Sequence, residues 1–126
     1  MTIVVDSDVL IEVSRGRNQG VLAAWEAAVG QGMNLACSPI SVAELWRGAR
    51  AAEFCLLEDL FRALGLLPIG ASTGKLAGDI LRKYSSSHGV ELADALIAAT
   101  ALEYDAELWT RNHRRYPSPG IRFHRP

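Results

Sequence analysis

The segment GVELADALIAATAL, residues 89–102, poses the main question of this sequence. Between Leu92 and Leu102 the only polar side chains are Asp94 and Thr100, and all the others are Ala, Leu or Ile. A helix of this composition is expected to be buried on nearly every side. A carboxylate in its first turn is costly unless a cap, a partner or a metal ion compensates the charge. The role of Asp94 therefore depends on which groups the fold brings to the same place.

Short apolar runs alternate with helical segments along the rest of the chain. A length of 126 residues suits one domain with one core. Strands that alternate with helices predict an α/β fold, a three-layer α/β/α sandwich with a mostly parallel central sheet, spanning residues 1–126. Strands are expected at 2–5, 34–37, 64–69, 106–110 and 121–124, and helices at 7–14, 19–30, 38–50, 52–64, 72–87 and from near Asp94 to about 104.

Capping residues mark the starts of two of these helices. Ser7 or Asp8 is suited to cap the first helix, because short polar side chains accept hydrogen bonds from free backbone N–H groups. Ser38 is the expected N-cap of the helix after the second strand, and Pro39 takes the first helical position, where its missing N–H is harmless. Both assignments place a helix directly after a strand.

The segment GASTGK, residues 70–75, only partly matches a phosphate-binding loop. The full pattern is G-x-x-x-x-G-K-[ST], and this sequence has Ile69 and Leu76 where Gly and Ser or Thr are required. We interpret the segment as a turn from strand to helix, with Ser72 or Thr73 as the cap.

Three acids and one amide are predicted to share one edge of the sheet. Asp6 ends the first strand, Glu44 lies in the second turn of the helix that follows the second strand, and Asn112 lies just past the fourth strand. Helices in parallel β/α units run antiparallel to the strands, so the first turn that carries Asp94 faces the same edge. Sites in such sheets lie beyond the carboxyl ends of the strands.

Each of these residues also has an explanation that needs no site. Asp6 could help to cap the first helix, and Ser41 with Glu44 could form a capping box. Asp94 could be a first-turn acid favoured by the helix dipole, and Asn112 could stabilise a turn. None of these explanations requires the four residues to share one edge.

Three neighbouring carboxylates favour a bound cation, because like charges raise one another's pKa. Mg²⁺ is a hard ion that binds carboxylate oxygens and keeps several waters. Such an ion can activate a water and stabilise the charge on a phosphate. No His lies in the apolar core pattern, which disfavours a zinc site. The acids therefore indicate metal-assisted phosphodiester hydrolysis.

Three segments carry a resemblance to a known family: VVDSDVLIE at 4–12, SPISVAELWRG at 38–48, and HGVELADALIAATALEYDAELWTRN at 88–112. With these segments the chain resembles PIN-domain ribonucleases, specifically the VapC-type toxins of bacterial type II toxin–antitoxin systems. The resemblance extends over the whole chain in order and spacing. It implies an α/β/α sandwich with a mostly parallel sheet, as the alternation of segments also predicts.

The resemblance further implies a metal-dependent endoribonuclease. Its acidic site carries over to Asp6, Glu44 and Asp94 as ligands of Mg²⁺, with Mn²⁺ as a substitute. The family often has a fourth acid where this chain has Asn112, and a hydroxyl where it has Thr110. The implied partners are a cognate antitoxin protein, an RNA substrate and a second copy of the chain in a homodimer.

The end of the chain is basic although the net charge is only −1. From residue 111 to residue 126 there are five Arg, two His and no acid. Arg111, Arg114 and Arg115 are therefore candidates for contacts with RNA phosphates. The alternative is an ordinary solvated surface.

Two other interpretations of the function remain open at this point. The motif VVDSD also resembles phosphatases that form an aspartyl phosphate, which would make Asp6 a nucleophile, although the chain is short for that fold. A non-catalytic RNA- or protein-binding module would use the basic end, and its function would survive neutralisation of the three acids.

The remaining composition suggests a cytoplasmic protein without membrane segments. Cys37 and Cys55 show no metal-binding or redox spacing and are expected to be reduced core thiols. The start of the chain does not resemble a signal peptide, and no run approaches the roughly 20 apolar residues of a membrane span. Trp25, Trp46 and Trp109 are expected in the core, with Trp46 on a partner surface as the alternative.

Overall fold

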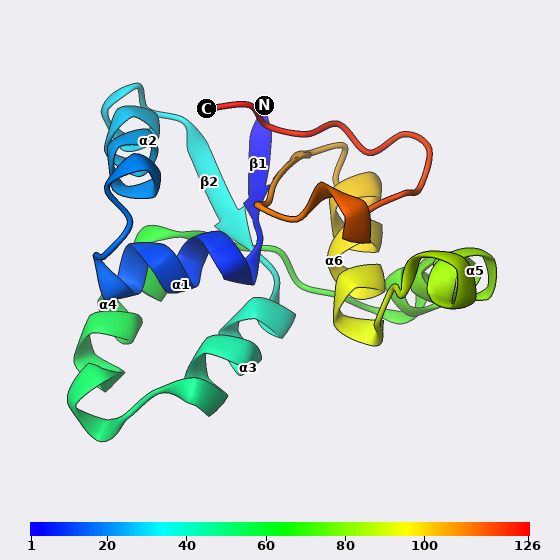
Figure 1. Cartoon of the computed structure of the whole chain (residues 1–126), viewed down its shortest axis with the longest axis horizontal. Coiled ribbons are helices and arrows are strands. Elements are labelled where there is room, and N and C mark those ends of the chain that lie inside the picture. Colours follow the sequence, from blue (N-terminus) through cyan, green and yellow to red (C-terminus); the bar gives the residue numbers. More distant parts are fainter.

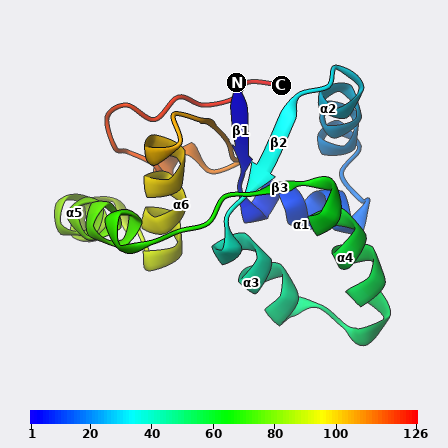
Figure 2. The ribbon, with the colours of Figure 1, turned by 180° about the vertical axis from the view of Figure 1, so that it is seen from behind.

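The computed structural model describes residues 1–126 and shows a parallel sheet between two layers of helices (Figure 1). The sheet order is β3-β2-β1-β4, and every neighbouring pair is parallel. The same layers are visible from behind in Figure 2. The strands are β1 (Thr2–Val5), β2 (Asn34–Cys37), β3 (Gly65–Leu66) and β4 (Glu107–Trp109). The predicted α/β/α sandwich is therefore confirmed.

Six α-helices cover the sheet. They are α1 (Ser7–Arg15), α2 (Gln19–Gly30), α3 (Pro39–Gly48), α4 (Phe54–Ala63), α5 (Ala71–His88) and α6 (Leu92–Glu103), with short 3₁₀ turns η1 (Ala51–Glu53) and η2 (His113–Arg115). None of the helices combines the length and the apolar composition that crossing a membrane requires.

The two faces of the sheet bury two separate apolar clusters. Ile3 and Val5 of β1 belong to the cluster under α1–α4, whereas Val4 between them belongs to the cluster under α5 and α6. This alternation follows from the two-residue period of a strand. Because both faces of β1 are covered, the strand is apolar and buried from Ile3 to Val5, as parallel strands usually are.

Helix α6 is buried as its composition predicts. Ala95, Ala98, Ala99 and Ala101 are each at most 2% exposed, and their small side chains let the helix pack closely against α5 and the sheet. Thr100 satisfies its buried hydroxyl within the helix by donating to the Leu96 carbonyl at 2.8 Å. Only Asp94 in the first turn needs compensation from outside the helix.

The helix starts agree with the sequence at α3 and differ at α1. Ser38 caps α3 by accepting from Ile40 N at 3.1 Å. At α1 the N-cap is Asp6, which accepts from Ser7 N at 2.7 Å, and neither Ser7 nor Asp8 caps the helix. The helix begins at Ser7, as the expected range 7–14 has it, and its cap is the residue that directly follows strand β1.

The predicted N-cap of α5 is wrong, because neither Ser72 nor Thr73 is the N-cap, although the Thr73 hydroxyl takes part in the cap. The N-cap position is Gly70, whose N–H donates to the Thr73 hydroxyl at 3.1 Å. Ser72 instead donates to Glu103 on α6 at 2.6 Å.

Two expected strands are shorter or absent. The third strand covers only Gly65–Leu66 instead of 64–69, because Pro68 has no N–H for the ladder. The fifth strand expected at 121–124 is a single parallel bridge between Leu108 and Phe123.

Two residues expected in the core lie at the surface. Trp46 is 40% exposed and stacks on Phe54, with ring centroids 4.5 Å apart. Cys55 is exposed, whereas Cys37 is buried, and neither forms a disulfide. The α3–α4 corner that carries Trp46 and Cys55 projects from the body of the protein, so it has no second layer to cover it (Figure 1).

Candidate active site

One cavity gathers the polar residues at the carboxyl edge of the sheet. Asp6 follows β1, Glu44 lies in α3, Asp94 lies in the first turn of α6, and Asn112 follows β4. The cavity has a volume of about 250 Å³ and is lined by Asp6, Ser7, Asp8, Ile11, Glu44, Asp94, Asn112, Arg115 and Tyr116. Four residues that are far apart in the sequence thus face one space.

Asp6 is a buried carboxylate held by three donors. It is 8% exposed and accepts from Ser7 N at 2.7 Å, from the Thr110 hydroxyl at 2.8 Å and from the Tyr116 hydroxyl at 2.8 Å. Burial first, and the charge of Asp8 second, raise the pKa of Asp6 to about 6, although the hydrogen bonds oppose this rise. Burial and the neighbouring carboxylates raise the pKa of Tyr116, so its hydroxyl remains a neutral donor.

Asp8 is a second acid at this edge that the sequence reasoning did not place in the site. Its Oδ2 accepts from Arg111 N at 3.1 Å and lies 3.4 Å from the Thr110 hydroxyl, while its Oδ1 is buried without a partner. Burial raises the pKa of Asp8. The spacing Asp6-x-Asp8 was a usable signal, because a residue in the first turn of α1 stays at the edge of the sheet.

Glu44 is held through α1. Ser7 Oγ donates to Glu44 Oε1 at 2.6 Å and lies 2.9 Å from Ser41 Oγ. The capping box considered for Ser41 and Glu44 is wrong, because α3 begins at Pro39 and both residues lie inside the helix. Two buried serines therefore connect α1 and α3 beneath the Glu44 carboxylate.

Asp94 has both a capping role and an ion-pair partner. Its Oδ2 accepts from Glu91 N at 3.0 Å and from Arg115 Nη1 at 3.1 Å. The side chain of Asp94 is 17% exposed, and that of Arg115 is 39% exposed. The carboxylate at the start of the buried helix is therefore compensated by a helix N-terminus and a guanidinium.

The segment 110–116, which follows β4, supplies most of these donors, and we call it the donor segment. Thr110 and Tyr116 donate to Asp6, Arg111 N donates to Asp8, and Arg115 donates to Asp94. Asn112 N donates to Thr110 Oγ at 3.0 Å and fixes that hydroxyl, while the Asn112 side chain is exposed at the cavity. Tyr116 carried no sequence signal, because its contact depends on the path of an irregular turn.

The oxygen atoms of these acids are suitable ligands for a hard cation, although the side chains do not lie close together. The acids offer only oxygen ligands, Asp8 with its unpartnered Oδ1 is among the residues that line the cavity, and burial makes a charged Asp6 costly. No three His, Cys, Asp or Glu side chains converge closely enough to hold an ion as they stand. Asp94 is tied to Arg115 and Glu44 to Ser7, so these side chains must reorient to share one ion.

His124 is buried, with 9% of its surface exposed, although it belongs to neither apolar cluster. Its Nδ1 lies 3.4 Å from Glu107 Oε1, and its ring is 5.0 Å from that of Trp109. His124 lines a different hollow from that of the acids, so it adds no ligand to their site.

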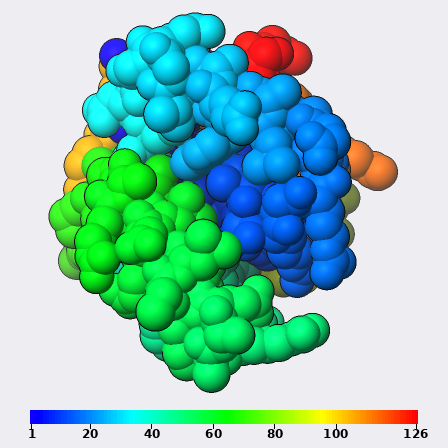
Figure 3. Space-filling model, turned by 90° about the vertical axis from the view of Figure 1, so that its left-hand side faces the viewer, coloured from blue at the N-terminus to red at the C-terminus, as the bar shows by residue number.

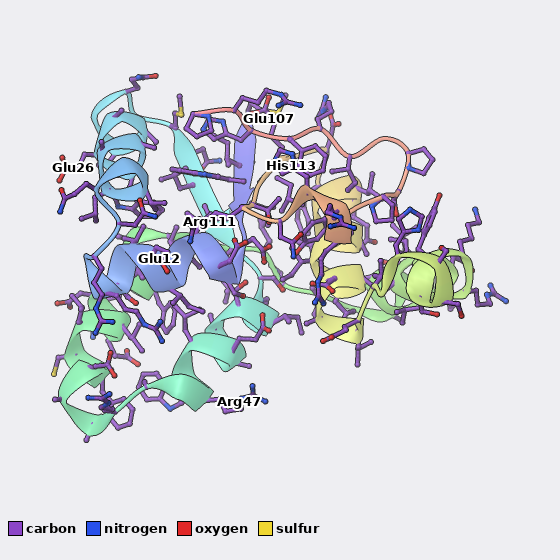
Figure 4. All side chains as sticks on the ribbon, in the orientation of Figure 1. Glu12, Glu26, Arg47, Glu107, Arg111 and His113 are labelled. Carbon is purple, nitrogen blue, oxygen red and sulfur yellow. The ribbon has the colours of Figure 1, made fainter.

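The three arginines proposed for RNA contacts have different surroundings. Arg111 lies 3.6 Å from Glu12 of α1 (Figure 4), Arg115 is paired with Asp94, and Arg114 is exposed without an ion pair. Arg111 also borders a separate hollow of about 450 Å³ that is lined by Arg125, His113 and His124 but by no acid.

Comparison with known proteins identifies the family. Residues 3–117 match the PIN domain, and the chain belongs to the PIN-domain family. It is 32% identical over 114 residues to Ribonuclease VapC19 of Mycobacterium tuberculosis, covering 90% of each chain. It is 40% identical over 118 residues to Ribonuclease VapC10 of the same organism, covering 91% of this chain and 86% of the relative. The resemblance drawn from the sequence is confirmed.

A solved structure supports the fold independently. The chain matches VapBC2 of Rickettsia felis, solved with a DNA fragment from its promoter, with a TM-score of 0.81 and coverage of 98% of both chains. The identity there is 20%, so this match concerns the fold alone.

Proposed function

We propose that this chain is a metal-dependent endoribonuclease and the toxin of a toxin–antitoxin pair. The observation that carries the proposal is the single cavity lined by Asp6, Glu44 and Asp94 in a PIN-domain fold. The ribonuclease names of relatives that align over about nine-tenths of this chain support RNA as the substrate. Asp6, Asp94 and Glu44 would hold Mg²⁺ or Mn²⁺, which supplies a water nucleophile and stabilises charge on the phosphate.

The protein side chains have separate tasks in this proposal. Thr110 and Tyr116 fix the orientation of Asp6 through one of its oxygens and favour its ionised form, whereas burial raises the pKa of this carboxyl to about 6. Ser7 directs Glu44 toward the cavity from α1. The hollow beside Arg111 is lined by basic residues and by no acid. It can therefore bind the RNA backbone next to the phosphate that enters the acidic cavity.

The proposed protein partner is an antitoxin. Structural neighbours of this fold are VapBC complexes, which supports such a partner. An apolar hollow of about 370 Å³ between α2 and α4, which includes Trp25, Val29 and Leu60, is a suitable place for an apolar segment of that partner. Figure 3 shows this face, with α2 and α4 on either side of a depression. Assembly as a homodimer and location in the cytoplasm belong to the same proposal.

The test is RNA cleavage by Asp6→Asn and Asp94→Asn variants with Mg²⁺ or Mn²⁺. Each should lose at least about 100-fold in rate, the scale typical of losing one electrostatic catalytic group. Asp59→Asn, an exposed acid on α4, is the matched control and should cleave at the parent rate. Full activity of either site variant, or cleavage in excess chelator, would contradict the metal mechanism. A phosphate covalently bound to Asp6 would favour the phosphatase reading instead.

A further inference from the structure

Arg115 forms an ion pair with Asp94, one of the acids that are proposed to bind the metal ion. One guanidinium nitrogen, Nη1, lies 3.1 Å from Asp94 Oδ2 and 3.3 Å from Glu91 Oε1. Asp94 is thus neutralised by a cation of the chain itself. This pair is one reason why three acids line one cavity and yet do not converge on a common point.

We propose that Arg115 is an exchangeable counter-ion of the acidic site, which pairs with Asp94 until a divalent cation binds and then contacts an RNA phosphate. The inference rests on the proposed metal-dependent nuclease function and adds a role for a residue that is not an acid. A divalent ion at Asp94 would disfavour the pair with Arg115, because two cations about 4 Å apart repel each other.

The local structure allows the side chain to leave while its backbone stays. The Arg115 side chain is 39% exposed, so its release from Asp94 opens no hole in the core. Its backbone is fixed because Arg115 N donates to the Asn112 carbonyl at 3.2 Å and the next residue, Tyr116, is bonded to Asp6. A released guanidinium therefore remains over the cavity, near the place where the acids act.

The chemistry of arginine suits the second partner. Its planar fork of N–H donors matches the oxygens of a phosphate as well as those of a carboxylate. RNA brings the phosphate to the same cavity in the proposed reaction. The exchange would therefore link metal binding to substrate binding: the ion frees the arginine that the substrate then uses.

The first experiment measures Mn²⁺ binding by titration calorimetry in the absence of nucleic acid. Arg115→Ala should bind Mn²⁺ about 10-fold more tightly than the parent, because both the competing ion pair and the nearby positive charge are gone. Arg114→Ala is the matched control, since it removes the same charge from an adjacent exposed residue. It should change the affinity by less than about 2-fold. Equal affinity in Arg115→Ala and the parent, or an equal gain in Arg114→Ala, would overturn the exchange.

The second experiment measures binding of a short single-stranded DNA, which offers the phosphates of RNA without the reactive 2′-hydroxyl. With saturating Mn²⁺, Arg115→Ala should bind this probe about 5-fold more weakly than the parent. In chelator the two proteins should bind it equally, because Arg115 of the parent is then held by Asp94. A loss of the same size in both conditions would show that Arg115 contacts phosphate regardless of the ion and would overturn the proposal.

Failure of the inference and failure of the proposed function give different results. If Mn²⁺ binds the parent and Arg115→Ala equally and Asp94→Asn abolishes binding, the exchange is wrong and the metal site remains. If Mn²⁺ binds none of these proteins, both the exchange and the metal-dependent function fall. Thermal unfolding of each variant checks that the fold is retained.

Discussion

Replacing Asp6 by Asn should stabilise the metal-free protein at neutral pH and not at acidic pH. The pKa of Asp6 rises from 3.8 to about 6 on folding, mainly because the carboxyl is buried. Each pKa unit corresponds to about 1.4 kcal/mol, so the charged carboxylate lowers the free energy of unfolding by about 3 kcal/mol. Asn removes this charge and remains a good N-cap for α1.

The gain is partly offset by lost hydrogen bonds. The Thr110 and Tyr116 hydroxyls both donate to Asp6 Oδ2, and an Asn amide nitrogen in that place accepts from neither of them. This loss costs about 1 kcal/mol. The net stabilisation at pH 7.5 is then about 2 kcal/mol, which raises Tm by roughly 8 °C in a domain of this size.

The pH dependence of the stability difference distinguishes the effect of the Asp6 charge from other effects of the substitution. A raised carboxyl pKa gives the parent extra stability below about pH 4, and that stability is lost as the pH rises through about 6. The advantage of Asp6→Asn should therefore be largest above pH 6.5 and should disappear or reverse near pH 4. Urea unfolding of both proteins in chelator, at several pH values, measures the difference. A difference that stays constant with pH, or a less stable variant at pH 7.5, would refute the reasoning.

Three further predictions concern Ser7, Asn112 and two arginines near the acidic site. Ser7→Ala frees Glu44 from its 2.6 Å hydrogen bond and should lower the cleavage rate about 10-fold, a loss that an unchanged rate would disprove. Asn112→Asp should lower the Mn²⁺ concentration for half-maximal cleavage, and Asn112→Ala should cost less activity than Asp94→Ala; superimposable Mn²⁺ curves for the parent and Asn112→Asp would remove Asn112 from the site. Replacing Arg111 and Arg114 by Ala should weaken the salt dependence of RNA binding: the slope of log affinity against log salt concentration should become shallower by about one to two. An unchanged slope would show that both side chains belong to the ordinary solvated surface.

The parts of the site that follow from regular structure were predictable from the sequence. The acids Asp6, Glu44 and Asp94 reach one edge because strand ends and helix starts alternate in a parallel β/α unit. The small residues of α6 likewise predict its burial. These features depend on periodicity, which a single sequence displays directly.

The contacts that cross between irregular segments were not predictable. Arg115 and Tyr116 reach Asp94 and Asp6 through the η2 turn after β4, and the path of such a turn has no periodic signal. The positions of Trp46 and Cys55 were wrong for a related reason. An apolar side chain shows its helix face in the sequence, but the sequence does not show whether another layer covers that face at a corner.

The donor segment is synthesised after all the acids of the site, and this order has a consequence for the folding of the site. The ribosome makes Asp6 more than a hundred residues before Thr110 and Tyr116, whose hydroxyls are two of the three donors to the Asp6 carboxylate. Strand β4 is also the neighbour that completes the sheet beside β1. A chain still being translated therefore has its acids but not the segment that orients them. For a ribonuclease this means that a chain still being synthesised lacks the oriented acidic site that cleavage would require.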